Sequence, residues 1–535
     1  MPQHPAAELG LLEELIEVRK NDFSALYLAV RDLHEFIRSR PNLIGLQTVL
    51  LLHRTLQSET HAAQTQSRVL YRELADTLLC LVLRPEVTEG ITERSLASLT
   101  TTLAHPAANP RRAAAEALGS LPIAVRGPVL PKPPCTQPAL LHWKQVLAHG
   151  HASGNGAPTR LGRSLVVPRT THGDLLVVKL ARIQDDPEAM HDEARWLEYF
   201  HATNENLPVR FDVPVPLLMA DHYLFRIVDP PWKFDNAASL HPEGYAIAFA
   251  AHHDYFHYVN ENSMGAQVNS ALFQEALFRN AWLLGKLTAK GIAHTAPIPL
   301  FHNRVQSHRR ADTGAYEWWR GGRLDRWLSS CRFPNLGLTG PRDFEHLRAF
   351  QGSQGRLHRL IGTHLLSLLL VAGSYFRNQD PERVGFDDQG QPIDARDLFD
   401  RHLLQRLVVG VIAEYYSGFV GTEFSGTVPV DFNALTLRMI DEMGVDRHME
   451  EILRVADQET MTDRQFQDFL RKRGYPQGKI ERLERGAGDV PIHTGPHLGA
   501  FNNRISLPEL IDLVAIASAL CVAGRYWQER GPFAG

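Results

Sequence analysis

Cysteine is scarce in this chain, which has only Cys80, Cys135, Cys331 and Cys521 among its 535 residues. The four lie far apart, and no two stand in the CxxC spacing of structural zinc sites and thiol oxidoreductases. Small secreted domains that depend on disulfides carry many more cysteines in a much shorter chain. The sequence therefore predicts a reduced protein in the cytoplasm, with each cysteine acting as a small buried apolar residue.

Long apolar runs and an excess of charge are also missing. The longest apolar stretch, LLSLLLVAGSYF at 365–376, is too short to cross a bilayer, which takes about 20 residues. The acidic, amphipathic first 20 residues lack the basic start and apolar run of a signal peptide. A net charge of −4 does not provide the basic surface that nucleic-acid binding requires. We expect a globular protein with no membrane span and no nucleic-acid partner.

The first part of the chain has the apolar spacing of helices. Within it, HPAANPRRAAAEALGSLP (105–122) has a proline start, an arginine pair, an alanine run and a glycine stop. This texture is typical of HEAT repeats, whose small residues let neighbouring helices stack closely. We predict a HEAT-like domain over 1–125, with an ordinary helical bundle as the alternative. Proline and glycine are frequent in 126–162, which we interpret as a linker.

Beyond residue 163 the pattern changes to that of strands. A hairpin around TTHG is followed by a helix over DDPEAMHDEARWLEYFHAT and by two short strands. After DPPWKF the chain is predicted to be helical again, with a long helix at 270–291 that leads into a polar loop. This order is that of a protein-kinase-like fold.

The fold class predicted from this order is α+β, with a bilobal kinase-like core between helical flanks. The N-lobe is predicted at 163–232 and the C-lobe at 233–400. A C-terminal helical region is predicted at 401–535.

Lys179 and Glu193 are the first candidate site residues. Lys179 is the one basic residue in the apolar strand DLLVVKL, where it needs either a partner or a path to solvent. Glu193 follows 14 positions later, inside the predicted helix. In kinases a strand lysine contacts the nucleotide phosphates, and a helix glutamate holds that lysine. The alternative is a solvent-facing lysine on an edge strand.

Asn303 and Asp343 are the candidate magnesium ligands. Asn303 lies in GIAHTAPIPLFHNR (291–304), the loop after the long helix, and Asp343 precedes a phenylalanine in GPRDFEHL (340–347). Kinases bind magnesium with an asparagine and an aspartate in these positions. The alternatives are a turn-capping asparagine and an aspartate that caps a helix beginning at FEHLRAF. Glu345, two positions after Asp343, is expected to be structural, as are His302 and His346.

Several kinase features are missing or altered. No GxGxxG loop is present, and HTA at His294 replaces the His-Arg-Asp triplet, which removes the usual catalytic base. The 40 residues from Asn303 to Asp343 hold a segment rich in arginine and tryptophan. Within the predicted nucleotide site, His294 and three arginines are candidate contacts for ATP or a carboxylate substrate. The arginines are Arg304, Arg309 and Arg310. A surface subdomain packed by its tryptophans is the alternative for this insertion.

On VVKLA, HDEARWL, GIAHTAPIPLFHNR and GPRDFEHL, the chain resembles the SidJ-related pseudokinases, a family of bacterial kinase-like proteins. The resemblance covers roughly residues 150–350 and extends only loosely to the helical flanks. It implies a glutamylase that uses Mg-ATP to adenylylate a carboxylate of a protein substrate, after which free glutamate displaces AMP. It also implies that Lys179 contacts phosphates, that Glu193 holds Lys179, and that Asn303 and Asp343 bind magnesium.

Other functions remain open from the sequence. The resemblance implies a protein activator, and the basic stretch RQFQDFLRKRGYPQGKIERLERG superficially resembles a calmodulin target, although a solvated helix face is the alternative. A catalytically inactive pseudokinase scaffold is the main alternative function. A protein phosphotransferase is a second alternative, disfavoured because a hydroxyl substrate needs a carboxylate base near it.

Overall fold

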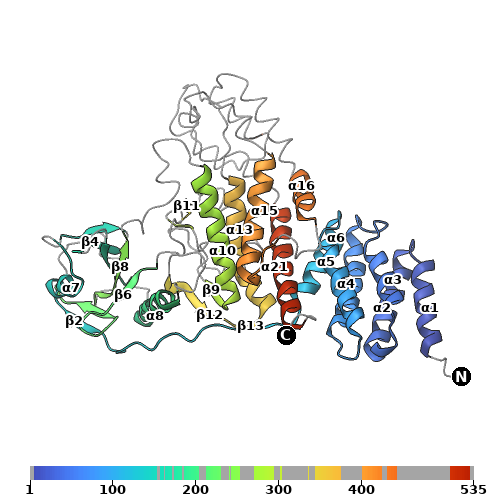
Figure 1. Cartoon of the computed structure of the whole chain (residues 1–535), viewed down its shortest axis with the longest axis horizontal. Helices are drawn as coiled ribbons and strands as arrows, with labels where there is room; N and C mark the ends of the chain where they lie inside the picture. Colours follow the sequence, from blue (N-terminus) through green and yellow to red (C-terminus); the bar gives the residue numbers. More distant parts are fainter. Residues whose placement is uncertain are drawn as a thin grey trace, which may run out of the picture.

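The computed structural model describes the chain in segments, which are residues 5–153, 157–161, 163–170, 174–182, 186–203, 213–229, 240, 243–252, 270–294, 302–303, 335–336, 344–374, 401–424, 431–442, 471 and 507–530. It is a mixed α/β structure, in which a curled sheet lies at one end and helices fill the rest (Figure 1). None of the helices in these segments is long and apolar enough to cross a membrane.

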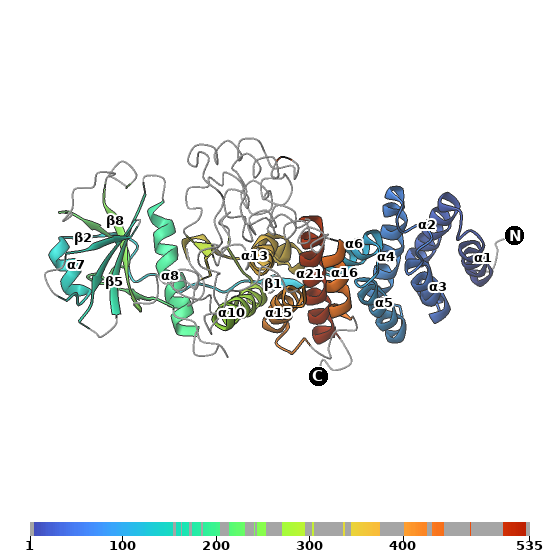
Figure 2. The ribbon, with the colours of Figure 1, turned by 90° about the horizontal axis from the view of Figure 1, so that it is seen from above.

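Six helices form the N-terminal part and lie in a row at the end opposite the sheet (Figures 1 and 2). They are α1 (Pro5–Val18), α2 (Phe23–Ser39), α3 (Leu46–Leu56), α4 (Arg68–Leu83), α5 (Glu89–Thr102) and α6 (Ala108–Gly119). The alanine run of α6 is buried, so its small side chains let α4 and α21 (Leu507–Arg530) pack closely against it. Residues 5–119 are thus helical, as the sequence predicted; the HEAT-like character of the domain stays a prediction.

The cysteines differ from one another in their surroundings. Cys80, Cys135 and Cys521 are free thiols, and Cys331 lies outside the described residues. Cys521 is fully buried in α21, as expected of a small apolar residue, but Cys80 and Cys135 are only half-buried. Burial opposes ionisation of the Cys80 thiol, yet contacts with His34 and Arg84 lower its pKa.

The sheet has seven strands in the order β2-β7-β8-β5-β4-β3, with β6 also paired to β8. Their bounds are β2 Ala139–Leu141, β3 Thr159–Leu161, β4 Ser164–Pro168, β5 Asp174–Leu180, β6 Val215–Leu217, β7 Phe225–Ile227 and β8 Tyr245–His252. β4 and β5 form the antiparallel hairpin that the sequence predicted, with Val166 opposite Val177. α7 (Trp143–His149) and α8 (Pro187–Thr203) cover opposite faces of the sheet.

Two predicted boundaries around the sheet are wrong. The supposed linker contains β2, α7 and β3, because Leu141, Trp143 and Val146 supply apolar side chains that the sheet buries. The N-lobe does not end at 232, since β8 follows at 245–252 and is the partner of β5. Its sequence YAIAFAAH is rich in alanine, which favours helices, but both of its faces are buried in a sheet.

The remaining described helices form a bundle (Figures 1 and 2). They are α10 (Ser270–Ala289), α13 (Gln354–Ser374), α15 (Arg401–Val420), α16 (Phe432–Glu442) and α21. α10 and α15 lie in close contact, and α21 packs against α13 and α15. The boundary predicted at residue 400 therefore does not separate two cores, because helices from both sides of it share one apolar interior.

One ion-pair network fastens the N-terminal helices to the bundle. Asp512 of α21 lies 2.8 Å from Arg112 and 3.9 Å from Arg111, both in α6. The Arg111 side chain is almost fully buried and also donates to the carbonyls of His105 and Pro106. The arginine pair that the sequence pattern singled out thus anchors the C-terminal helix of the described structure to the N-terminal helices.

Short strands connect the sheet end to the bundle. β9 (Ile292–His294) pairs with β12 (Leu347–Ala349), and β1 (Ala124–Arg126) pairs with β13 (Gln351–Ser353). β10 (His302–Asn303) pairs with β11 (Asn335–Leu336). The one-turn 3-10 helix η6 (Phe344–His346) directly precedes β12. Residues that lie far apart in sequence are thereby brought next to α8.

Candidate functional site

Lys179 lies on β5, between β4 and β8, and points toward α8. Leu176 and Val178 pack with Trp143 of α7, whereas Val177 packs with Trp196 of α8. Since side chains alternate along a strand, Lys179 lies on the same face as Val177. It is 7% exposed. The alternative of a solvent-facing lysine on an edge strand is therefore wrong.

Glu193 is the partner of Lys179. Lys179 Nζ donates to Glu193 Oε1 at 2.6 Å, and the glutamate is 3% exposed. α8 places Glu193 on its buried face, together with Met190 and Trp196. The structure thus contains the lysine–glutamate pair that we inferred from a spacing of 14 residues, although the catalytic role of the pair stays a prediction.

Glu345, which the sequence pattern predicted to be structural, is a second partner of Lys179. Its Oε2 accepts from Lys179 Nζ at 2.7 Å, and its Oε1 pairs with Arg163. Arg163 was not singled out from the sequence either. It directly precedes β4, and its carbonyl accepts from the backbone N–H of Leu180. The sequence does carry a signal for Arg163, because it is a basic residue directly before β4, the strand that pairs with the strand of Lys179.

Two carboxylates and two cations therefore form one cluster, in which Lys179 and Glu193 are buried and Glu345 and Arg163 are partly buried. Burial and the neighbouring charge of Glu345 raise the pKa of Glu193 to about 7. Glu193 Oε2 is also buried and has no hydrogen-bond partner among the described residues. Burial opposes ionisation of Glu345 as well, but Lys179 and Arg163 hold its pKa well below the usual range. Glu345 is thus the carboxylate that the cations hold more strongly in its ionised form.

The segment around Glu345 is anchored to α8. The Phe344 ring is buried, with its centroid 5.7 Å from that of Phe200. Trp196 Nε1 donates to the Leu347 carbonyl at 3.0 Å. FEHLRAF forms the single helical turn η6 and then β12, so the helix that Asp343 was considered to cap is only one 3-10 turn long. The residue two positions after Asp343 is the one that touches Lys179.

His294 is buried at the end of β9, opposite Leu347 of β12. Its ring centroid lies 5.8 Å from that of His346 and 5.3 Å from that of His364. The predicted nucleotide contact thus lies on the strand paired to the one that follows Glu345.

The side chains of the other predicted ligands lie outside the described part of the structure. The backbone of Asn303 lies in β10 opposite Asn335, but its side chain is outside the described part of the structure. Asp343 and the three candidate arginines also lie outside the described residues; these arginines are Arg304, Arg309 and Arg310. The convergence of Lys179, Asn303 and Asp343 on one magnesium site therefore stays a prediction.

Two buried histidines of α13, His358 and His364, lead to a prediction about acid stability. Burial lowers the pKa of His358 to about 3 and, despite a hydrogen bond to the His294 carbonyl, that of His364 to about 4. An unfolded histidine has a pKa of about 6.5, so the unfolded state binds two more protons than the native state as pH falls below that value. We expect the free energy of unfolding to decrease by about 2 kcal/mol between about pH 6.5 and 5.5.

Urea unfolding at the two pH values measures this difference. A His358→Gln/His364→Gln variant is the control, and its unfolding free energy should vary less over the same interval. An equal pH dependence in the wild type and the variant would contradict the assignment.

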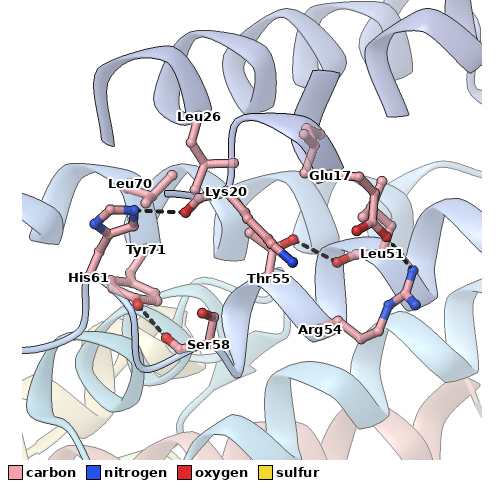
Figure 3. A pocket seen from close by; sticks show the side chains of 11 residues that line it. Glu17, Lys20, Leu26, Leu51, Arg54, Thr55, Ser58, His61, Leu70 and Tyr71 are labelled. Carbon is pink, nitrogen blue, oxygen red and sulfur yellow. Dashed lines mark hydrogen bonds and ion pairs between the residues drawn. The ribbon is translucent and has the colours of Figure 1, made fainter. Parts of the chain in front are cut away.

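A cavity of about 300 Å³ lies apart from this site, among the N-terminal helices (Figure 3). Tyr71 there donates to the Ser58 carbonyl at 2.6 Å, and the ring of His61 donates to the Lys20 carbonyl at 2.9 Å. Arg54 pairs with Glu17 at its rim. These polar groups mostly satisfy one another, which is typical of a cleft between packed helices. The chemistry-bearing cluster is therefore the one around Lys179.

Comparison with known proteins does not supply a function for the chain. It matches no known protein family and no curated protein.

Proposed function

We propose that this chain is an ATP- and magnesium-dependent transferase that modifies a protein, on a kinase-like fold related to the SidJ family. The buried Lys179–Glu193 pair is the observation that carries the proposal, because it joins a central strand to the helix that follows it. This is the arrangement that kinases use to hold a lysine against nucleotide phosphates. The HEAT-like character of α1–α6 and the bilobal division of the core belong to the same proposal.

The residues have distinct roles in this proposal. Lys179 contacts the phosphates of ATP, and Glu193 fixes its position. Two cations, the buried Lys179 and the partly buried Arg163, already converge on one carboxylate, and such a pair of donors suits a phosphate group. Asn303 and Asp343 hold the magnesium ion that neutralises the phosphates. His294 and the three candidate arginines supply further nucleotide contacts.

Glutamylation is the reaction we favour, with adenylylation of the target as the simpler variant. The carboxylate of the protein substrate attacks the α-phosphate of ATP and releases pyrophosphate, and free glutamate then displaces AMP by forming an amide bond. A carboxylate nucleophile is already ionised at neutral pH, so the missing loop aspartate is tolerated. A protein activator belongs to the proposal only through the family resemblance.

A catalytically inactive scaffold is the second candidate. It is favoured by the contact of Glu345 with Lys179, since a lysine held by two carboxylates is already satisfied. In that case the kinase-like core and the N-terminal helices bind a protein partner without chemistry.

Intact-mass spectrometry of the purified chain with Mg-ATP and free glutamate tests the proposal. We expect a mass increase that matches glutamyl, adenylyl or phosphoryl addition and is absent from an Asp343→Ala variant. Calorimetric titration with Mg-ATP is done on the same samples. ATP binding with no transfer, alone or with cell extract as a source of substrate, would favour the scaffold. The absence of both binding and transfer would refute the proposal.

A further inference from the structure

Glu345 occupies a position suited to a phosphate group. One of its carboxylate oxygens accepts from Lys179 and the other from Arg163, and its side chain is only 12% exposed. A carboxylate and a phosphate both present two acceptor oxygens to such a pair of cations. The same two side chains therefore suit either the carboxylate of Glu345 or a phosphate group of a ligand.

Lys179 cannot easily hold both glutamates and a phosphate. It has three N–H donors, and two of them already bind carboxylates at 2.6 and 2.7 Å, so only one is left for a phosphate. Glu193 comes from the middle of a 17-residue helix and is the more deeply buried of the two. Glu345 comes from a single 3-10 turn. Of the two carboxylates, Glu345 is the one that can leave Lys179 with less rearrangement.

We infer that Glu345 is an internal competitor for the phosphate groups of ATP, and that nucleotide binding requires its carboxylate to leave Lys179 and Arg163. This inference rests on the proposed function, because it specifies how the same site is regulated. The backbone of the segment stays anchored through Phe344 and Leu347, so the movement is one of the Glu345 side chain. The apparent affinity for ATP is then reduced by the fraction of molecules in which Glu345 is displaced.

Calorimetric titration of the full chain with Mg-ATP tests the inference in three variants, at about pH 8, where Glu193 is ionised. Glu345→Gln keeps the shape of the side chain but removes its charge, and we expect it to bind ATP at least about 10-fold more tightly than the wild type. Glu193→Gln removes the same charge from the same cluster, but we expect it to bind ATP more weakly, because Lys179 loses its holder.

The opposite signs of these two effects separate competition from a general change of charge, which would strengthen ATP binding in both variants. Glu345→Asp is the third variant, and it serves if Glu345→Gln fails to fold, as judged by circular dichroism. Its side chain is one methylene too short to reach both cations, so we expect an intermediate gain in affinity.

The outcomes separate this inference from the proposed function. Tighter binding by Glu345→Gln or Glu345→Asp, without tighter binding by Glu193→Gln, supports the inference, including the case in which the wild type binds too weakly to measure. Tighter binding by the Glu345 and the Glu193 variants alike would show a general effect of charge and overturn the inference. Binding by the wild type that stays equal or weakens in the Glu345 variants overturns the inference and leaves the proposed function standing. No ATP binding by any variant overturns both.

Discussion

Replacing Gly418 with alanine is expected to destabilise the protein by at least about 3 kcal/mol, because the helices α10 and α15 touch through their backbones at this point. A Cβ atom on Gly418 would lie 2.1 Å from the Trp282 carbonyl oxygen, and one on Gly285 would lie 2.2 Å from the Tyr415 carbonyl oxygen. Both obstacles are backbone atoms, so no side chain can rotate away. The helices would have to separate and open the core between them.

Helix propensity alone predicts that Gly418→Ala stabilises the protein. Alanine is favoured over glycine in a helix interior by about 1 kcal/mol, so the steric term must exceed this gain. Gly10 in α1 provides the matched control, because a Cβ atom there meets nothing within 4 Å. Urea unfolding should show Gly10→Ala as neutral or more stable than the wild type, and Gly418→Ala as much less stable. If both variants gained stability, the close contact of α10 with α15 would be incorrect.

Replacing Lys179 with methionine is expected to remove about 3–5 kcal/mol from the free energy of unfolding at neutral pH. Methionine preserves most of the volume, but Glu193 and Glu345 then lose their shared cation and keep their burial. Glu345 keeps its ion pair with Arg163. The loss should therefore come mainly from Glu193, which loses its hydrogen-bonded cation and, with its pKa raised further, must bind a proton to remain buried.

A double-mutant comparison isolates this cause. If the loss comes from the unpaired Glu193, Lys179→Met/Glu193→Gln should be more stable than Lys179→Met alone, because the amide carries no charge. Chemical unfolding of the wild type, both single variants and the double variant measures the coupling. Additive losses from the two substitutions would show that the lysine and glutamate do not interact in the folded protein.

Part of the site followed directly from local sequence pattern. The hairpin pattern around TTHG predicted a strand over DLLVVKL, with a lysine that needed either a partner or a path to solvent, and HDEARWL predicted a helix with a glutamate on it. Both segments form the expected elements, and the two side chains meet. Such elements follow from sequence because the side-chain period of a strand or helix is set by a few neighbouring residues.

Other parts of the fold were misread from the same kind of pattern. The alanines of β8 are typical of a helix, although β8 is a strand. The prolines and glycines of 126–162 predicted a linker in a segment that contains β2, α7 and β3. In both cases burial against the sheet outweighed local preference, and burial depends on what the rest of the chain provides. The separation of the C-terminal helices into their own region failed for the same reason, since helices on both sides of residue 400 share one core.

By itself, the sequence determined that this protein carries a hairpin, a helix and a long second helix, with Lys179 and Glu193 on the hairpin and on the first of these helices; the kinase-like character of this order stays a prediction. Only the tertiary structure decided that Glu345 and Arg163 complete the cluster, because Glu345 lies 166 positions from Lys179 and 182 from Arg163 along the chain. Contacts at such separations have no local signature. They arise because Phe344 and Leu347 pack against α8, which places the intervening carboxylate between Lys179 and Arg163.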